Sequence, residues 1–162
     1  MIRQMSEADY QRVAEIHIFA QRTTYRGIFS DKWLFADSTV VSRLKDIENW
    51  FDTPMAHGVV YEQDGIIKGF AIMSNHEVDG YEIERIFVDP FMQGCGIGRA
   101  LLVYCEDYGV KQGFKAACLW ILEENYEARR FYEINGYKSS DKREYFADAN
   151  VWQVMYIKDV KK

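Results

Sequence analysis

The spacing of apolar residues changes several times along the chain, and each change predicts a different element. Over residues 10–22 and 40–51 apolar side chains recur every three or four positions, which is the spacing of a buried helix face. Ser6 and Asp9 resemble a capping box that opens the first of these helices. The segment MIRQM is expected to form a short strand before it.

From residue 57 onward the pattern has the period of strands. Two apolar runs, GVVYEQ and IIKGFAIM, flank Asp64-Gly65, a dipeptide typical of a hairpin turn. The next run, residues 81–88, alternates strictly and predicts a strand with two distinct faces. One face would carry Tyr81, Ile83, Arg85 and Phe87, and the other Glu82, Glu84, Ile86 and Val88.

Helices and strands then alternate to the end of the chain. Apolar residues from Ile97 to Tyr108 lie on one helical stripe, which Gly113 can end, and KAACLWIL follows as a buried strand. YEARRFYEI is a further helix with Asn125 as a good N-cap, and EYFADANVWQVMYI is expected to form two strands around a turn. The order β-α-α-β-β-β-α-β-α-β-β predicts a layered α/β or α+β domain built on a mixed sheet.

Composition limits the domain count and the class of partner. The chain has 162 residues, 48% of them hydrophobic, enough for one full core, and without a linker-like tract residues 1–162 are expected to be a single domain. A net charge of −5 argues against nucleic acid or an anionic membrane as the main partner and fits a basic amine better. No apolar run approaches the ~20 residues that span a bilayer, and MIRQMSEADY is polar, so a cytoplasmic location is expected.

Cysteine and histidine spacing does not suggest a metal site. Cys95, Cys105 and Cys118 form no C-x-x-C pair, and the three histidines fall in separate predicted elements. We therefore expect reduced thiols and no bound metal.

Three alternate glycines precede the helix expected from Ile97. Gly94, Gly96 and Gly98 leave backbone N–H groups uncovered where unpaired donors and the helix dipole favour an anion such as a pyrophosphate. A tight strand-to-helix turn would explain the same residues without any ligand. The spacing differs from the G-x-G-x-x-G of a dinucleotide-binding turn, and no G-K-[ST] follows as in a Walker loop.

The flanks of this loop resemble the GNAT acetyltransferase family. QGCGIG, residues 93–98, matches the family's acetyl-CoA signature [QR]-x-x-G-x-[GA], and NYEARRFYEINGY is similar to its N-x-x-A-x-x-[FL]-Y-x-x-x-G-[FY] helix. The similarity extends over about residues 57–140. It implies an α/β (α+β) fold with a mixed, mostly antiparallel sheet of about six to seven strands flanked by about four helices.

The resemblance also implies a site for acetyl-CoA as cosubstrate. Strands 81–88 and 115–122 would splay apart to admit the pantetheine arm, and the pyrophosphate would rest on the N–H groups of residues 93–99. The residues expected to hold it are Phe87, Val88, Gln93, Gly94, Gly96, Gly98, Arg99 and Asn125. For Asn125, a structural N-cap is an equally good account.

Acetyl transfer to an amine calls for a base and benefits from an acid. An alkylammonium with a pKa near ~10 must lose a proton before it attacks, and the resemblance offers Glu82 or Glu84, with Glu84 favoured because it is nearer the splay. Either could instead be a solvated or ion-paired carboxylate. Tyr132, in FYEING, occupies the position of the family's general acid, with a packing role as the alternative.

Aromatic residues before residue 57 are divided between the acceptor pocket and the core. Tyr25 and Phe29 are expected to contact the acceptor, because this segment walls the acceptor pocket in similar proteins. The residues expected in the core are Trp33, Phe35, Trp50 and Phe51.

These features predict an acetyl-CoA-dependent N-acetyltransferase that moves an acetyl group directly to a primary amine of a small molecule or peptide. The alternatives are a non-catalytic acyl-CoA-binding sensor or interaction module, a transferase for another acyl donor or an oxygen acceptor, and an unrelated nucleotide-binding module. Because residues 145–158 are rich in Tyr, Val, Trp and Met, they could complete the sheet or face a second copy, and a homodimer is expected.

Overall fold

The computed structural model describes residues 1–52, 56–76 and 80–160. In this part of the chain, seven strands and four α-helices follow one another in the predicted order. The strands are β1 (Ile2–Gln4), β2 (Ala56–Gln63), β3 (Ile66–His76), β4 (Gly80–Val88), β5 (Ala116–Leu122), β6 (Lys138–Phe146) and β7 (Val151–Asp159). The helices are α1 (Tyr10–Thr24), α2 (Val40–Phe51), α3 (Ile97–Lys111) and α4 (Tyr126–Ile134), and short helical turns are η1 (Glu7–Asp9), η2 (Trp33–Asp37), η3 (Pro90–Met92) and η4 (Ala147–Ala149). No helix within the described ranges is long and apolar enough to cross a membrane.

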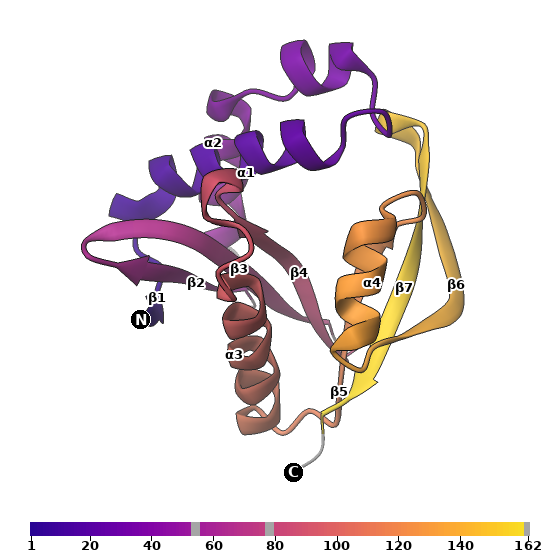
Figure 1. Cartoon of the computed structure of the whole chain (residues 1–162). Helices are drawn as coiled ribbons and strands as arrows, with labels where there is room; N and C mark the ends of the chain where they lie inside the picture. The colour runs from indigo at the N-terminus through magenta and orange to yellow at the C-terminus, as the bar shows by residue number, and fades with distance from the viewer. Residues whose placement is uncertain (53–55, 77–79, 161–162) are drawn as a thin grey trace.

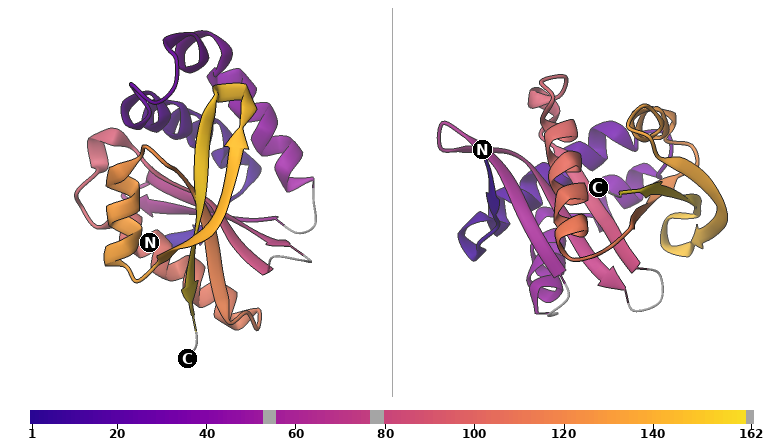
Figure 2. Two further views of the ribbon diagram at one scale, coloured as in Figure 1. Left: turned by 90° about the vertical axis from the view of Figure 1, so that its right-hand side faces the viewer. Right: turned by 90° about the horizontal axis from the view of Figure 1, so that it is seen from below.

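The strands form one mixed sheet in the order β1-β2-β3-β4-β5-β7-β6 (Figure 1). Neighbouring strands run antiparallel except β4 and β5, which run parallel. This confirms the predicted mixed, mostly antiparallel sheet. Helices α1 and α2 pack on one face of its first four strands, and α3 packs on the other (Figure 2).

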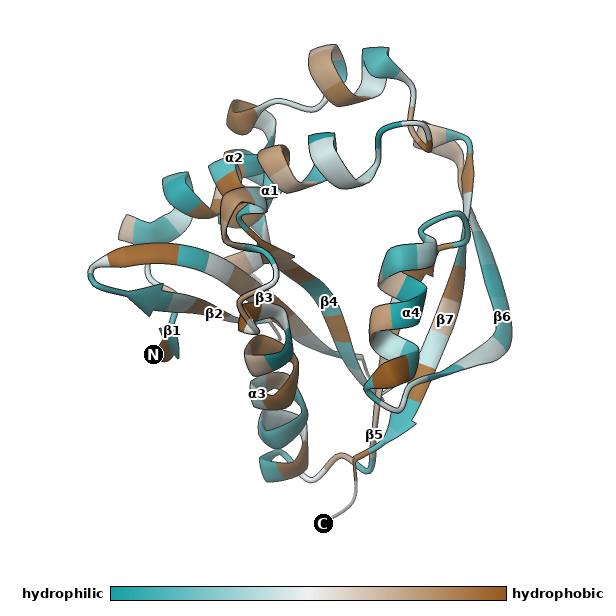
Figure 3. Ribbon diagram, in the orientation of Figure 1, coloured by the Kyte–Doolittle hydropathy of each residue, from teal (hydrophilic) through white to brown (hydrophobic). Residues whose placement is uncertain are grey.

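Alternation along β2 and β3 builds a separate core on each face of the sheet. Val59 and Met73 pack in the cluster beneath α3, whereas their chain neighbours Val60 and Ile72 pack in the cluster beneath α1. Strand β6, at the edge of the sheet, is largely hydrophilic by comparison (Figure 3). The core therefore lies over β2–β5. The candidate catalytic carboxylates lie in the same part of the sheet.

A β-bulge interrupts the alternation of β4. Ile72 of β3 lies opposite Arg85, and the next residue, Met73, lies opposite Ile83, so Glu84 is an extra residue in β4. Ile83 packs in the cluster beneath α3, but Phe87 packs beneath α1. The prediction that Tyr81, Ile83, Arg85 and Phe87 share one face is wrong, because one inserted residue inverts the facing of everything after it.

Strands β4 and β5 separate soon after they meet. Their pairing is confined to Tyr81 opposite Ala117 and Glu82 opposite Cys118. Beyond these residues β5 continues along β7 to Leu122, while β4 stays with β3 up to Val88. The sheet therefore opens between β4 and β5, as the resemblance implies, and Figure 1 shows the gap between their ribbons.

Candidate active site

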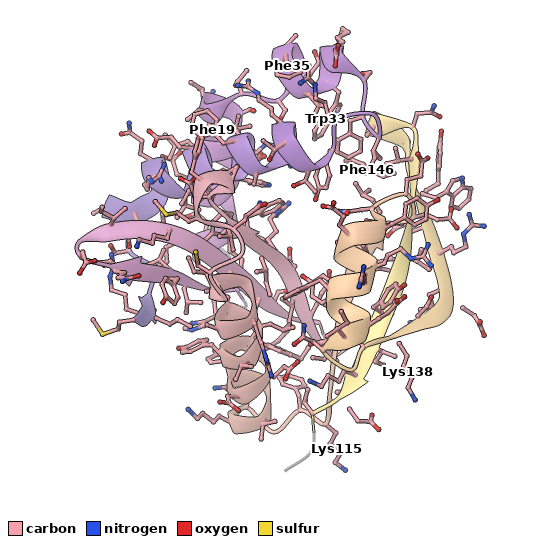
Figure 4. The ribbon with its side chains drawn as sticks, in the orientation of Figure 1. Phe19, Trp33, Phe35, Lys115, Lys138 and Phe146 are labelled. Carbon is pink, nitrogen blue, oxygen red and sulfur yellow. The ribbon has the colours of Figure 1, made fainter. Side chains whose placement is uncertain are left out.

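A cleft of about 950 Å³ occupies the opening between β4 and β5. Its walls come from β4, β5, the loop before α3, helix α4 and the end of α1 with the segment that follows it. Trp33 lines its upper part from η2, and Phe146 lines it from the end of β6 (Figure 4). All the residues predicted for the site line this one cleft: Tyr25, Phe29, Glu82, Glu84, Phe87, Val88, Gln93, Gly94, Gly96, Gly98, Arg99, Asn125 and Tyr132.

The glycine loop borders the cleft with an uncovered backbone. Gly94 and Gly96 have φ angles of +78° and +77°, and a Cβ atom on either would meet nothing within 4 Å. Gly96 is the N-cap of α3, and its carbonyl accepts the first bond of the helix from the Ala100 N–H at 3.0 Å. The N–H groups that follow Gly96 belong to the first helical turn, which has no intrahelical acceptors. These two glycines thus serve a left-handed backbone and leave the donors accessible.

Gly98 differs from the two glycines before it. Its φ is not in the left-handed region, and an added Cβ would lie 3.7 Å from Phe131 and 3.8 Å from Val88, which is ordinary contact. Arg99, one residue on, is exposed and lines the cleft. The loop therefore has the shape and charge that a pyrophosphate group requires.

The rim of the cleft offers backbone from β4 and a side chain from α4. Phe87 and Val88 lie beyond the stretch where β4 pairs with β5, so this edge of β4 faces the cleft rather than another strand. Asn125 is buried, and its Oδ1 accepts a 3.1 Å hydrogen bond from the Ala128 N–H at the start of α4. The N-cap role is thus observed, and it uses only the carboxamide oxygen.

Tyr132 lies on α4 among other aromatic rings. Its ring centroid is 5.0 Å from that of Phe131 and 5.6 Å from that of Tyr137, both nearly perpendicular to it. Burial, with smaller contributions from Cys105 and Tyr25, raises the pKa of the Tyr132 phenol well above its ordinary value. The phenol is therefore protonated at neutral pH and able to donate a hydrogen bond into the cleft.

The two candidate bases occupy different positions on β4. Glu82 is at the last residue that pairs with β5, and Glu84 is the extra residue of the bulge. Both line the cleft. The bulge thus brings a second carboxylate to the point where the strands part, although strict alternation does not predict such an arrangement.

A pair of arginines lies at the α1–α2 end of the cleft. The Arg85 guanidinium is 4.5 Å from the ring centroid of Trp50, and Arg43 lies 5.9 Å from that of Trp33. Arg43 also pairs with Asp46 through Nη1 at 2.8 Å. Burial lowers the pKa of Arg85, and the Glu84 carboxylate opposes that shift.

His17, on α1, completes this end of the cleft. The residue is 4% exposed, its ring centroid is 4.6 Å from that of Phe87, and burial together with Arg85 and Arg43 lowers its pKa well below the ordinary value. Within the described residues, neither His17 Nε2 nor Arg43 Nε has a hydrogen-bond partner, and both atoms are buried. Sequence analysis missed this cluster, because its three members come from α1, α2 and β4.

The predicted acceptor contacts, Tyr25 and Phe29, line the cleft next to Trp33. The rings of Tyr25 and Phe29 are 5.0 Å apart, and Phe29 is 4.3 Å from Trp33. Burial raises the pKa of Tyr25 to about 12.

The four aromatic residues expected in the core have different positions. Phe51 and Trp50 both pack against the core beneath α1. The Arg85 guanidinium also lies over the Trp50 ring. The prediction is wrong for Phe35, which is 48% exposed with Arg22 over its ring. Trp33 lines the cleft, so this residue, which was predicted to lie in the core, is a candidate for ligand contact.

The described residues contain no group of three or more His, Cys, Asp or Glu side chains placed to hold a metal ion. The three cysteines, all within the described residues, form no disulfide; Cys95 is exposed in the glycine loop and the other two are buried.

Comparisons with known proteins agree with this geometry. The model of the Acetyltransferase (GNAT) family matches residues 20–137. The uncharacterized N-acetyltransferase YuaI of Bacillus subtilis is 28% identical over 130 residues, which cover 76% of this chain and 72% of that protein. An uncharacterized N-acetyltransferase of Archaeoglobus fulgidus is 27% identical over 141 residues, with coverages of 81% and 88%.

Among solved structures, the PaiA N-acetyltransferase from Thermoplasma acidophilum in complex with coenzyme A has the same fold. It superposes with a TM-score of 0.78 at 22% sequence identity, over 98% of each chain. A fold likeness at this identity says nothing of the acceptor. The family match over most of the chain, together with the opened sheet and the glycine loop beside it, shows that this chain belongs to the GNAT acetyltransferase family.

Proposed function

We propose that the protein transfers the acetyl group of acetyl-CoA directly to a primary amine. The observation that carries this proposal is the separation of β4 and β5 after Glu82, which opens a cleft bordered by the glycine loop, two carboxylates and a buried phenol. The PaiA N-acetyltransferase, which shares the fold, was solved with coenzyme A bound.

The donor would lie between the separated strands. Its pyrophosphate would be held by the N–H groups that follow Gly94 and Gly96, with Arg99 adding a positive charge. The pantetheine arm would pair with the backbone of Phe87 and Val88, as a partial strand does. When bound, acetyl-CoA supplies an activated thioester, and the protein supplies position and proton transfer.

Glu84 is the base that we favour, with Glu82 as the alternative. A carboxylate acting directly or through a water can take the ammonium proton, so that the neutral amine attacks. The bulge places Glu84 at the point where the strands part, whereas Glu82 still lies in the paired region.

Tyr132 is the proposed acid. Its raised pKa keeps the phenol protonated, so that it can donate to the departing thiolate sulfur. The thiol of ordinary pKa ~8.5 leaves with only modest assistance, so Tyr132 is expected to accelerate the reaction rather than to permit it. The Val88 N–H would polarise the thioester carbonyl.

Turnover with a panel of amines tests this proposal. Release of CoA that requires both acetyl-CoA and an amine supports it, and calorimetry measures donor binding separately. Acetyl-CoA binding without transfer to polyamines, amino acids, aminoglycosides or peptides would favour a sensor instead. Transfer only from longer acyl-CoA would favour a different donor, and binding of ATP or NAD in place of CoA would contradict the whole assignment.

Two further features belong to the same proposal. Tyr25 and Phe29, whose rings are in contact and line the cleft, would wall its acceptor side. The hairpin of β6 and β7 exposes Tyr145 and Trp152, each 45% accessible, and we propose that this surface joins two copies into a homodimer.

A further inference from the structure

The end of the cleft beneath α1 and α2 holds more positive charge than acetyl transfer requires. Arg43 and Arg85 both line the cleft, and Arg43 is close enough to contribute to the lowered pKa of Arg85. Each guanidinium lies over a tryptophan ring, Trp33 and Trp50 respectively. Stacking of this kind holds the planar groups in place and leaves their edge N–H donors for other partners.

Two polar atoms in this cluster lack partners. His17 Nε2 and Arg43 Nε are buried without a hydrogen bond to any described residue. A buried polar atom without a hydrogen-bond partner destabilises the fold by about 1–3 kcal/mol, so such atoms mark a place where a ligand or an ordered water completes the site. Arg43 Nε is a donor, the neutral His17 ring can donate from Nε2 in one of its two tautomers, and the Arg85 guanidinium lines the same cleft, so an oxygen-bearing anion suits this cluster best.

The neighbouring carboxylates limit the charge of that anion. Asp46 pairs with Arg43 at 2.8 Å, and Glu84 interacts with Arg85. These two carboxylates balance the two guanidinium charges, so the N–H donors that remain on the arginines suit a carboxylate with one negative charge better than a doubly charged phosphate. Glu82 and Glu84 line the same cleft, where they can attract an ammonium group.

We propose that His17, Arg43 and Arg85 form a carboxylate subsite, and that the acceptor is an amine that also carries a carboxylate. This inference rests on the proposed acetyl transfer and specifies its substrate class. A zwitterionic acceptor places its carboxylate against the guanidinium groups and its amine beside Glu84, in reach of the thioester. A polyamine lacks any group for the two arginines and would bring like charge against them.

The test uses matched pairs of acceptors that differ in this charge, and kcat/KM is compared per neutral amine because the amide also lowers the pKa of the neighbouring ammonium group. Glycine, β-alanine and 4-aminobutyrate are compared with glycinamide, β-alaninamide and 4-aminobutyramide, and the three lengths sample the distance from amine to carboxylate. Peptides that begin with Asp or Asn distinguish a side-chain carboxylate from that of a free amino acid. We expect at least one carboxylate to exceed its amide by about 10- to 100-fold in kcat/KM, the effect of one charge-assisted hydrogen-bonded contact.

Binding is measured separately from turnover by NMR titration of the same acceptors into the protein with CoA, which cannot transfer an acetyl group. We expect the same order of affinities. Transfer to amines without any preference for a carboxylate would leave the proposed function standing and overturn the subsite. Absence of transfer to every amine, with carboxylates still bound more tightly than amides, would retain the subsite and overturn the proposed function.

Variants connect the preference to the cluster. Arg43→Gln removes one guanidinium that is 18% exposed and paired with a surface carboxylate, and we expect it to reduce the carboxylate preference to less than about threefold. Arg43→Lys keeps the charge and the stem but loses Nε, and we expect an intermediate value. Lys45→Gln removes a charge from the exposed side of the same helix and should leave the preference unchanged. An undiminished preference in both Arg43 variants would overturn the assignment.

Discussion

The Tyr132 phenol combines two properties that separate a proton donor from a packing residue. It lines the cleft, and burial raises its pKa well above the ordinary value, so it keeps its proton at neutral pH. Many buried tyrosines share the second property alone. Tyr81 donates to the Cys105 carbonyl at 2.7 Å from within the core, and it has no access to the cleft.

Replacement of Tyr132 by Phe tests the proposed acid. The variant keeps the ring and its contacts, so acetyl-CoA affinity should stay within a few-fold, while the single-turnover rate should fall by roughly 10- to 1,000-fold. Single-turnover kinetics are needed because slow product release can mask the chemical step. Tyr126→Phe is the control, since that residue is 70% exposed on the same helix. An unchanged rate in Tyr132→Phe would make Tyr132 a packing residue.

Replacement of Glu84 by Gln tests the proposed base. Without a base, transfer relies on amine that is already neutral, and that fraction falls as the pH falls below ~10. We expect kcat/KM to fall by about 100-fold near pH 7, and the defect to shrink toward pH 9.5.

Glu82→Gln is the matched variant, since both carboxylates line the same cleft. A larger, pH-dependent defect in Glu82→Gln would assign the base to that residue. Full activity of both variants across the pH range would remove the carboxylates from the mechanism.

At the scale of elements, the glycines at the two ends of α3 allow a role in ligand binding to be tested apart from a purely conformational role. Gly96 at the N-terminus and Gly113 after the C-terminus both have positive φ and open space around a Cβ. An aspartate at either place strains the backbone by a similar amount. Only Gly96→Asp puts a carboxylate where a pyrophosphate would bind, so it should weaken acetyl-CoA binding by at least about 10-fold in calorimetry. Equal affinities in Gly96→Asp and Gly113→Asp would refute the anion cradle.

The junction of β1 and α1 makes a second prediction for an element, this time on stability. Asp9, whose side chain is 7% exposed, accepts hydrogen bonds from Arg3 at 2.7 and 2.9 Å and from the Ser6 N–H at 2.8 Å. The Arg3 bonds chiefly lower its pKa from 3.8 to about 2. A depressed carboxyl pKa stabilises the fold above the unfolded pKa, and the contribution disappears as the pH falls through about 2.

Asp9→Asn should therefore lower the free energy of unfolding by about 2 kcal/mol at pH 7. The difference from the native chain should shrink between pH 4 and pH 2, as followed by denaturant unfolding at each pH. Asp107→Asn, on the exposed side of α3, should show no such dependence. A difference that persists unchanged at pH 2 would contradict the ionic origin of the effect.

Most element boundaries followed from the sequence, because the helices and strands have a clear period and a clear stop. Strand β6 is the exception: it begins at Lys138, whereas the sequence predicted its start at EYF, because residues 138–143 are polar and mostly exposed and show no apolar alternation. The bulge in β4 could not be predicted, because YEIERIFV alternates without a break. The extra residue is visible only from the pairing of β4 with β3. The glycine loop before α3 was predictable from three alternate glycines in the chain. The arginine and histidine cluster was not, because tertiary packing alone brings α1, α2 and β4 together.

For the whole molecule, the remaining question is how the open edge of the sheet is covered. Strand β6 is an edge strand with most of its residues exposed, and the facing hairpin partners Tyr145 and Trp152, with Ile157 on β7, expose 44–45% of their surface. Exposed apolar side chains on an edge hairpin are suited to a second copy. The same hairpin contributes Phe146 to the cleft, so association through the β6–β7 hairpin would also stabilise one wall of the site.

Light scattering at working concentration tests this association. We expect a mass of twice the 19.0 kDa chain, because burial of aromatic side chains at the centre of an interface is its main source of affinity. Trp152→Lys places charge on this surface and should shift the protein toward the monomer, whereas Phe35→Lys, on the exposed aromatic residue above α1, should leave the mass unchanged. Residue 152 does not line the cleft, so acetyl-CoA affinity should persist in the monomer. A native mass equal to one chain, or a dimer insensitive to Trp152→Lys, would remove the β6–β7 surface as the interface.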